Sequence, residues 1–184
     1  MSRPYEKGLR GSLMVVNRVW AMPHKNTFKI KPIGELVERY ASEEKVIIDP
    51  FANSSKIGTI TNDLNPKFDT DYHLDALDFL KLMKTQSADV VLYDPPFSVR
   101  QRVECYESVG ITPTMEHTKA SWRSNHLNEI ARIVKPGGYC LSFGWNTNGV
   151  GKTRGFEIVE ILVVAHGGSH NDTLCTVEKK VKYD

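Results

Sequence analysis

The chain has 184 residues, of which 40% are hydrophobic and 25% are charged, and its formal net charge is +2. These values are typical of one compact globular domain, so we expect a single domain spanning 1–184, and they exclude collagen-like and disordered chains. No apolar stretch approaches the roughly 20 residues that span a bilayer, and no secretory signal is visible. The charge is too small to establish a polyanionic partner by itself.

The three cysteines, Cys105, Cys140 and Cys175, lie far apart and match no metal-ligand spacing. Cys140 and Cys175 fall in apolar runs, where a free thiol behaves as a small hydrophobic side chain. His166 and His170 are four residues apart, but the two glycines between them predict a hairpin loop instead of a helical metal site. We therefore expect no metal and a reducing, cytoplasmic compartment.

Beyond the first thirty-odd residues, β-rich runs alternate with helical ones. Apolar runs predict strands at 46–48, 57–60, 88–93 and 139–143, with a weaker one at 72–74. Helical spacing predicts helices at 76–84 and 126–134, the second ended by 135–138. Two further runs, 156–165 and 173–181, predict a β-hairpin. The pattern predicts an α/β fold whose sheet is mostly parallel, is covered by helices on both faces and ends in an antiparallel strand.

Acidic residues stand at or just after the ends of these strands: Asp49, Asp63, Asp75 and Asp94. Ligands of open α/β sheets bind beyond the carboxyl ends of the strands. We therefore expect these four carboxylates to converge on one rim of the sheet. As a group they are more informative than any one of them alone.

Three of the carboxylates allow a ligand-binding or a structural interpretation. Asp49, in the turn Asp49-Pro50-Phe51-Ala52, could hold a positively charged amino group or cap a helix. Asp63 could accept two ribose hydroxyls or serve the turn in which it lies. Asp75 could accept from an adenine amino group, cap the helix that begins at Ala76, or do both.

The most specific motif is Asp94-Pro95-Pro96-Phe97, which follows the strand at 88–93. Two prolines cannot continue a central strand, so the chain must leave the sheet there in an extended form. The Asp94 carboxylate and the Pro95 carbonyl then become two fixed acceptors, which suit the two hydrogens of an NH₂ group. Phe97 offers a face on which a base can stack. An ordinary turn is the alternative, but the upstream carboxylates favour a catalytic role.

These motifs resemble those of the N6-adenine amino-methyltransferases, in order from about Asn26 to the C-terminus. Thr27 to Tyr40 resembles the upstream segment and helix that close over the methionine end of the cofactor, and Asp94 to Phe97 matches the catalytic signature. The resemblance implies a Rossmann-like class I methyltransferase sheet and S-adenosylmethionine as cofactor. The cofactor residues that it implies are Phe28, Lys29, Ile30, Asp49, Pro50, Phe51, Ala52, Asn53, Asp63, Asp75 and Ala76. Length and motif order most resemble small phage-encoded adenine DNA methyltransferases.

The chain departs from this family in two respects. Asn53 and Ser55 stand where the family's cofactor turn has glycines, although Asn tolerates left-handed backbone better than most residues. No stretch is long enough for a separate target-recognition domain, so we expect recognition from the N-terminal arm, from a second subunit or from 98–123. We interpret 98–123 as a mobile active-site loop whose cations and aromatic contact substrate: Arg100, Arg102, Lys119, Trp122 and Arg123.

We expect transfer of a methyl group to the exocyclic N6 of adenine in DNA, with a homodimer or a partner subunit as a further possibility. RNA adenine is the nearest rival substrate, because the signature holds a base amino group and not the sugar. Glutamine and N4-cytosine enzymes more often resemble N-P-P-Y or carry Ser at the first position. A non-catalytic nucleic-acid-binding subunit of a heteromeric methyltransferase is the alternative from another class.

Overall fold

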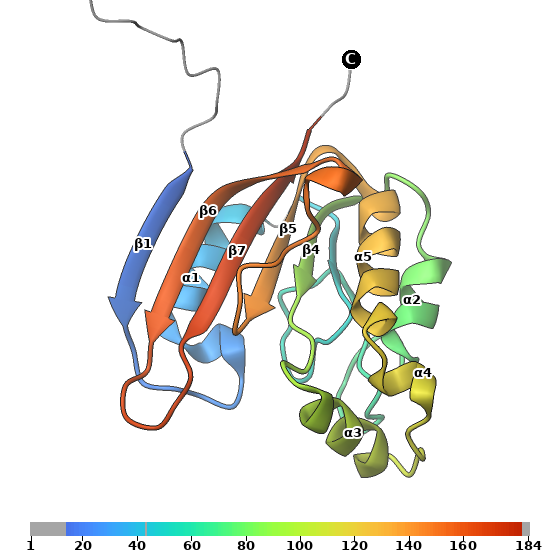
Figure 1. The fold of residues 1–184 in the computed structure, drawn as a ribbon. Helices are drawn as coiled ribbons and strands as arrows, with labels where there is room; N and C mark the ends of the chain where they lie inside the picture. Colours follow the sequence, from blue (N-terminus) through green and yellow to red (C-terminus); the bar gives the residue numbers. More distant parts are fainter. Residues whose placement is uncertain (1–13, 43, 182–184) are drawn as a thin grey trace, which may run out of the picture.

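A seven-stranded sheet forms the centre of the molecule (Figure 1). The computed structural model describes residues 14–42 and 44–181. In spatial order the strands are β1, β6, β7, β5, β4, β2 and β3. Their bounds are β1 Val15–Trp20, β2 Ile47–Asp49, β3 Ile60–Thr61, β4 Ala88–Tyr93, β5 Val134–Gly144, β6 Phe156–Ala165 and β7 Thr173–Lys180.

Helices cover the sheet from both sides, as expected from the alternation in the sequence. The α-helices are α1 Lys31–Tyr40, α2 Ala76–Leu82, α3 Val99–Ser108, α4 Met115–Thr118 and α5 Ser121–Ile133. Two short 3₁₀ helices are η1 Thr27–Lys29 and η2 Lys152–Arg154. Figure 1 shows α1 behind β6 and β7, whereas α2 and α5 lie toward the β4 side of the sheet.

Two hydrophobic cores separate these layers. On one face, Ile33, Leu36 and Val37 of α1 pack against strand residues such as Val90 and Leu141. On the other face, side chains of α2 and α5 pack against β2, β4 and β5, and the contributors include Phe79, Leu80, Leu127, Ile130, Ile48, Val91 and Cys140. Alternate residues of one strand therefore enter different cores, which is how a sheet buried on both faces is built.

The strand directions confirm the predicted topology. Strands β1 and β6, and strands β2, β3, β4 and β5, pair in parallel, whereas β7 is antiparallel to both β5 and β6. The crossovers between parallel strands bring the carboxyl ends of β2, β3, β4 and β5 to one edge. That edge carries Asp49 at the end of β2 and Asp94 directly after β4.

The apolar runs gave better predictions than the mixed segments. The strands at 88–93 and 156–165 are confirmed at both ends, and β7 differs from its prediction by one residue. The strand predicted at 57–60 is reduced to Ile60–Thr61, and 72–74 contributes only an isolated bridge between Asn62 and Tyr72. Helix α5 begins at Ser121 instead of His126.

Two features of the fold differ from what the sequence predicts. The prediction that 98–123 is an irregular loop is wrong, because this segment forms α3, α4 and the first turn of α5. Strand β1 was not predicted. It is paired along only one edge and most of its side chains are exposed, so it shows no burial alternation that a sequence pattern could reveal.

Among the described residues, no helix is both long enough and apolar enough to cross a membrane. Cys140 and Cys175 are buried, as expected for thiols in apolar strands, whereas Cys105 is exposed. His166 is buried beside the hairpin, where it hydrogen bonds to the Ala21 carbonyl and the Thr173 hydroxyl.

Helix α2 provides a matched test of the core. Leu80 is 0% exposed and Leu82 is 59% exposed, although both lie on the same helix. We expect Leu80→Ala to lower the free energy of unfolding by about 2–5 kcal/mol, because it leaves a cavity in the core. Leu82→Ala should change it by less than about 0.5 kcal/mol. Chemical denaturation measures both, and equal losses would contradict the placement of α2.

Candidate active site

A cavity of about 730 Å³ opens at the carboxyl ends of β2, β3 and β4. It is bounded by the segment around η1, by the turn after β2, by Asp63 and by the segment from Asp94 into α3. The predicted site residues that line it are Phe28, Lys29, Phe51, Ala52, Asn53, Asp63, Asp94, Pro95, Pro96 and Phe97. Residues from Phe28 to Phe97, which are far apart in the sequence, thus meet around one space of ligand size.

The Asp94 carboxylate is the most unusual group in this cavity. It follows the fully buried end of β4, and its Oδ1 atom is buried without a hydrogen-bond partner among the described residues. Burial raises the pKa of Asp94 to about 6, and a hydrogen bond with the Thr27 side chain opposes the rise. A carboxylate with an unpaired buried oxygen is costly in a folded protein, and such groups gather at functional sites.

Phe97 forms the part of the wall next to Asp94. Its backbone N–H donates to the Gln101 side-chain oxygen over 2.7 Å, which anchors the motif to the first turn of α3. Its ring lies 5.8 Å from the ring of Trp145, with an angle of 70° between the planes. Trp145 is 42% exposed and directly follows β5. Sequence reasoning missed it, although an aromatic residue just past a strand end was visible.

Asp49 lies beneath the cavity instead of lining it. The residue is 0% exposed, one carboxylate oxygen accepts from the Phe51 N–H, and the other has no partner in the described part of the chain. Burial first, and then the negative charges of Asp94 and Asp63, raise the pKa of Asp49 well above its usual value. Its neighbour Pro50 accepts a hydrogen bond from the Asn62 side chain and also lies outside the lining.

Asp63 organises the turn that follows β2. One oxygen accepts from the Asn53 N–H at 2.9 Å and the other accepts from the Asn65 N–H at 2.8 Å. Asn53 has a φ of +50°, which Asn adopts more readily than most residues do. Burial raises the pKa of Asp63, and these two N–H groups oppose the rise.

Besides Asp49 and Pro50, three further residues predicted to bind the cofactor do not line the cavity. Asp75 caps α2 by accepting from the Leu77 N–H at 2.9 Å, so its structural interpretation is confirmed. Its other oxygen accepts from the Tyr106 hydroxyl. Ile30 and Ala76 are 5% and 6% exposed, and they belong to the packed interior.

The five residues predicted to contact substrate do not gather around one cavity. Arg100 and Lys119 form exposed pairs with glutamates on their own helical segments. The Arg102 guanidinium lies 4.5 Å above the Trp122 ring, and Trp122 is only 8% exposed, so a base cannot stack on this tryptophan. Arg123 lines a second cavity, described below.

Trp122 belongs to an aromatic cluster that supports the site from below, which the sequence analysis also missed. Its ring is 4.2 Å from that of His126, and Phe51 contacts both rings. His126 is 0% exposed and hydrogen bonds through Nδ1 to the Tyr93 hydroxyl at 3.1 Å. Burial lowers the pKa of His126 to about 4, so the ring is neutral at neutral pH. The cluster fixes the end of β4 from which Asp94 projects.

Comparisons with known proteins were made by family, by sequence and by structure. No family model matches the chain, and no curated protein matches its sequence. Solved structures do match. Burkholderia thailandensis 1,6-didemethyltoxoflavin-N1-methyltransferase, with bound 1,6-didemethyltoxoflavin and S-adenosylhomocysteine, has a TM-score of 0.55 at 11% identity, covering 83% of this chain and 78% of that chain.

Two further structures extend this likeness. TrmN from Thermus thermophilus has a TM-score of 0.54 at 18% identity, covering 94% of this chain but only 51% of that one. A SAM-dependent methyltransferase from Archaeoglobus fulgidus has a TM-score of 0.54 at 12% identity, covering 82% and 94%. Together with the strand order, these matches establish the class I methyltransferase fold, as the sequence predicted.

The raised pKa of Asp94 predicts a particular dependence of stability on pH. The folded-state pKa of about 6 exceeds the usual 3.8, so the folded state holds the proton more tightly. Unfolding free energy should therefore fall as pH rises from about 4 to above 6, by up to about 3 kcal/mol. In Asp94→Asn the unfolding free energy should fall less over this pH range, because asparagine has no carboxyl group to titrate. Denaturation of both proteins from pH 4 to 8 measures the difference, and parallel profiles would contradict it.

Proposed function

We propose that this protein transfers a methyl group from S-adenosylmethionine to the exocyclic N6 of adenine in a nucleic acid, with DNA as the first candidate. The observation that carries the proposal is the buried Asp94 Oδ1, which has no hydrogen-bond partner among the described residues and belongs to a cavity that Phe97 and Asp63 also line. Such an acceptor can take a hydrogen bond from a ligand. An NH₂ group held against an aromatic face supplies one.

The cavity suits S-adenosylmethionine in size and in charge. Its volume of about 730 Å³ lies within the range of small-molecule sites. This cofactor carries a cationic sulfonium and a cationic amino group, and the carboxylates of Asp49, Asp63 and Asp94 are near enough to raise the pKa of Asp49 by their mutual repulsion. A cationic ligand relieves that repulsion. Asp63, which accepts from the Asn53 N–H and lines the cavity, would accept from ribose hydroxyls.

The protein's contribution to transfer is mainly orientation and electrostatics. The sulfonium supplies an already activated methyl group, whose bond to sulfur breaks as a bond to nitrogen forms. Asp94 and the Pro95 carbonyl would hold the two amino hydrogens, which makes the nitrogen lone pair available. Phe97 would stack with the base. With a pKa of about 6, Asp94 is a better acceptor for the departing proton than an ordinary aspartate.

The choice of adenine rests on the resemblance of Asp94 to Phe97 to the N6-adenine signature. The toxoflavin-precursor enzyme of the same fold is named as an N1-methyltransferase, so a nitrogen acceptor is compatible with this architecture. A fold alone does not define a substrate. DNA precedes RNA in the proposal because the motif order resembles DNA enzymes.

Substitution of Asp94 tests the catalytic role. We expect Asp94→Ala to bind the cofactor and to lose at least about a hundredfold in transfer rate, because one of the two acceptors for the amino group is gone. The assay supplies radiolabelled methyl donor with duplex DNA, single-stranded DNA or RNA and then identifies the modified nucleoside.

The control for this test is Asp78→Ala, which removes an exposed carboxylate of α2. This control should keep full activity. Full activity of Asp94→Ala would contradict the catalytic assignment. If the modified nucleoside is not N6-methyladenine, the proposed acceptor atom is wrong and the nucleoside found identifies the true one.

Substitution of Asp63 tests the cofactor site separately. Loss of a hydrogen bond to a charged group costs about 1.5–3 kcal/mol, so Asp63→Ala should weaken S-adenosylhomocysteine binding roughly tenfold to a hundredfold. Calorimetric titration measures the affinity, and circular dichroism establishes that the variant is folded. Asp78→Ala again serves as the control. Unchanged affinity in Asp63→Ala would remove Asp63 from the cofactor site.

A further inference from the structure

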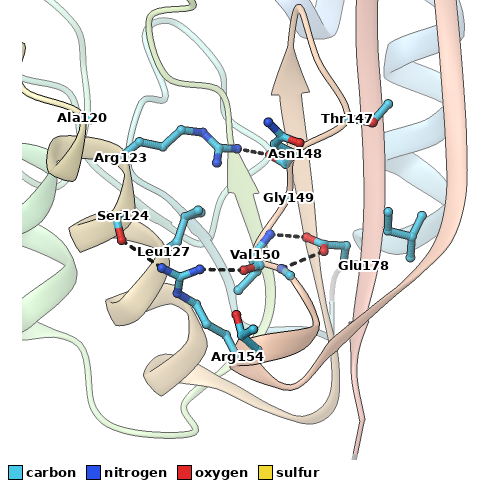
Figure 2. Close-up of a pocket in the computed structure, with 13 residues that line it drawn as sticks. Ala120, Arg123, Ser124, Leu127, Thr147, Asn148, Gly149, Val150, Arg154 and Glu178 are labelled. Carbon is cyan, nitrogen blue, oxygen red and sulfur yellow. Dashed lines mark hydrogen bonds between the residues drawn. The ribbon is translucent and has the colours of Figure 1, made fainter.

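A second cavity, of about 520 Å³, lies between α5 and the connection from β5 to β6. We call it the α5 groove. Ala120, Arg123 and Ser124 of the α5 side form one wall, and Thr147 to Gly151 with Arg154 form the other (Figure 2). Its lining shares no residue with the Asp94 cavity. It is therefore a distinct candidate site.

The walls of the α5 groove are held in place by hydrogen bonds. Glu178 of β7 is buried, and its two carboxylate oxygens accept the N–H groups of Val150 and Gly151. A Cβ on Gly149 would overlap this carboxylate, so the connection can lie this close to β7 only with glycine there. Arg154 donates to the Val150 carbonyl at 3.0 Å and to the Ser124 hydroxyl at 2.9 Å, which ties the connection to α5.

The chemistry of the lining suits a phosphodiester. Arg123 and Arg154 bring two positive charges against the single negative charge of Glu178. The Glu178 oxygens are already occupied by N–H donors, and both arginines act electrostatically on that carboxylate. Arg123 donates through one nitrogen to the Asn148 carbonyl, and a guanidinium has five N–H groups. Arginine, hydroxyl groups and backbone N–H groups are the usual contacts of nucleic-acid phosphates.

Two contacts connect the walls of the α5 groove with the segment from Tyr93 to Phe97. The Arg123 guanidinium is 5.5 Å from the ring of Tyr93, the residue directly before Asp94. The connection that forms the far wall starts with Trp145, whose ring contacts that of Phe97. These two contacts are the structural link between the α5 groove and the wall of the Asp94 cavity.

We infer that the α5 groove binds a phosphodiester of the nucleic-acid strand next to the target adenine, with Arg123 as the contacting cation. This inference rests on the proposed function and extends it, because it places substrate recognition on α5 and on the β5–β6 connection. Phosphate contacts of this kind set the position of a strand and add salt-dependent affinity without reading its sequence.

The test measures binding of a short fluorescent oligodeoxynucleotide that contains adenine, over a series of salt concentrations. The full chain is used with S-adenosylhomocysteine added. Arg123→Gln should weaken binding roughly tenfold and lower the slope of log K against log salt by about 0.7, the value for one lost contact to a single strand. Arg123→Lys should keep the slope, because it keeps the charge. Lys81→Gln removes an exposed cation of α2 and should change neither quantity.

The outcomes separate this inference from the proposed function. If the wild-type protein methylates the oligonucleotide but Arg123→Gln binds it with unchanged affinity and slope, the groove assignment fails and the proposed function stands. Equal weakening by Lys81→Gln would also overturn the groove, since binding would then follow overall charge. If the wild-type protein neither binds nor methylates nucleic acid, both proposals fail. Unchanged affinity of Arg123→Gln for S-adenosylhomocysteine establishes that the variant is folded.

Discussion

The end of β4 is the constraint on which the rest of the site depends. This strand lies between β2 and β5 and is buried by helices on both faces, so its last residue, Tyr93, is 0% exposed. The two prolines that follow Asp94 cannot continue the hydrogen-bonded ladder, and the chain must leave the sheet at that residue. A carboxylate is thereby fixed at the edge of the sheet, where burial raises its pKa. Within the described part of the chain its Oδ1 has no hydrogen-bond partner.

Aromatic packing stabilises this arrangement. It also occupies Arg102 and Trp122, two side chains that the sequence suggested as substrate contacts. Trp122 and Arg102 are a cation and an aromatic in a polar segment, which is also the composition of a nucleic-acid-binding surface. In the structure they stack on each other, and Trp122 packs against His126 beneath the site. His126 in turn bonds to Tyr93. These residues pack beneath the end of β4, and in this way they position the Asp94 carboxylate.

What the sequence could predict follows from how each element obtains its stability. Strands β4 and β6 are continuous apolar runs, so the sequence of each segment alone indicates that it is a strand and where it ends. Strand β1 depends on β6, which lies more than a hundred residues away in the chain, and its own side chains stay exposed. For the site, Asp94 to Phe97 and the Asp63 turn were recognisable from motif order. The sequence could not show that Asp75 lies outside the cavity lining, because only the tertiary structure brings the Tyr106 hydroxyl to its carboxylate.

The connection between β5 and β6 forms one wall of the α5 groove. Parallel strands that are joined by a crossover usually have a helix between them, but here Trp145 to Gly155 contains only the single turn η2. With no α-helix there, the connection lies against Glu178 and lines the α5 groove. Trp145, its first residue, has its ring next to that of Phe97. One buried carboxylate therefore fixes the course of a loop that borders both the α5 groove and the aromatic wall of the Asp94 cavity.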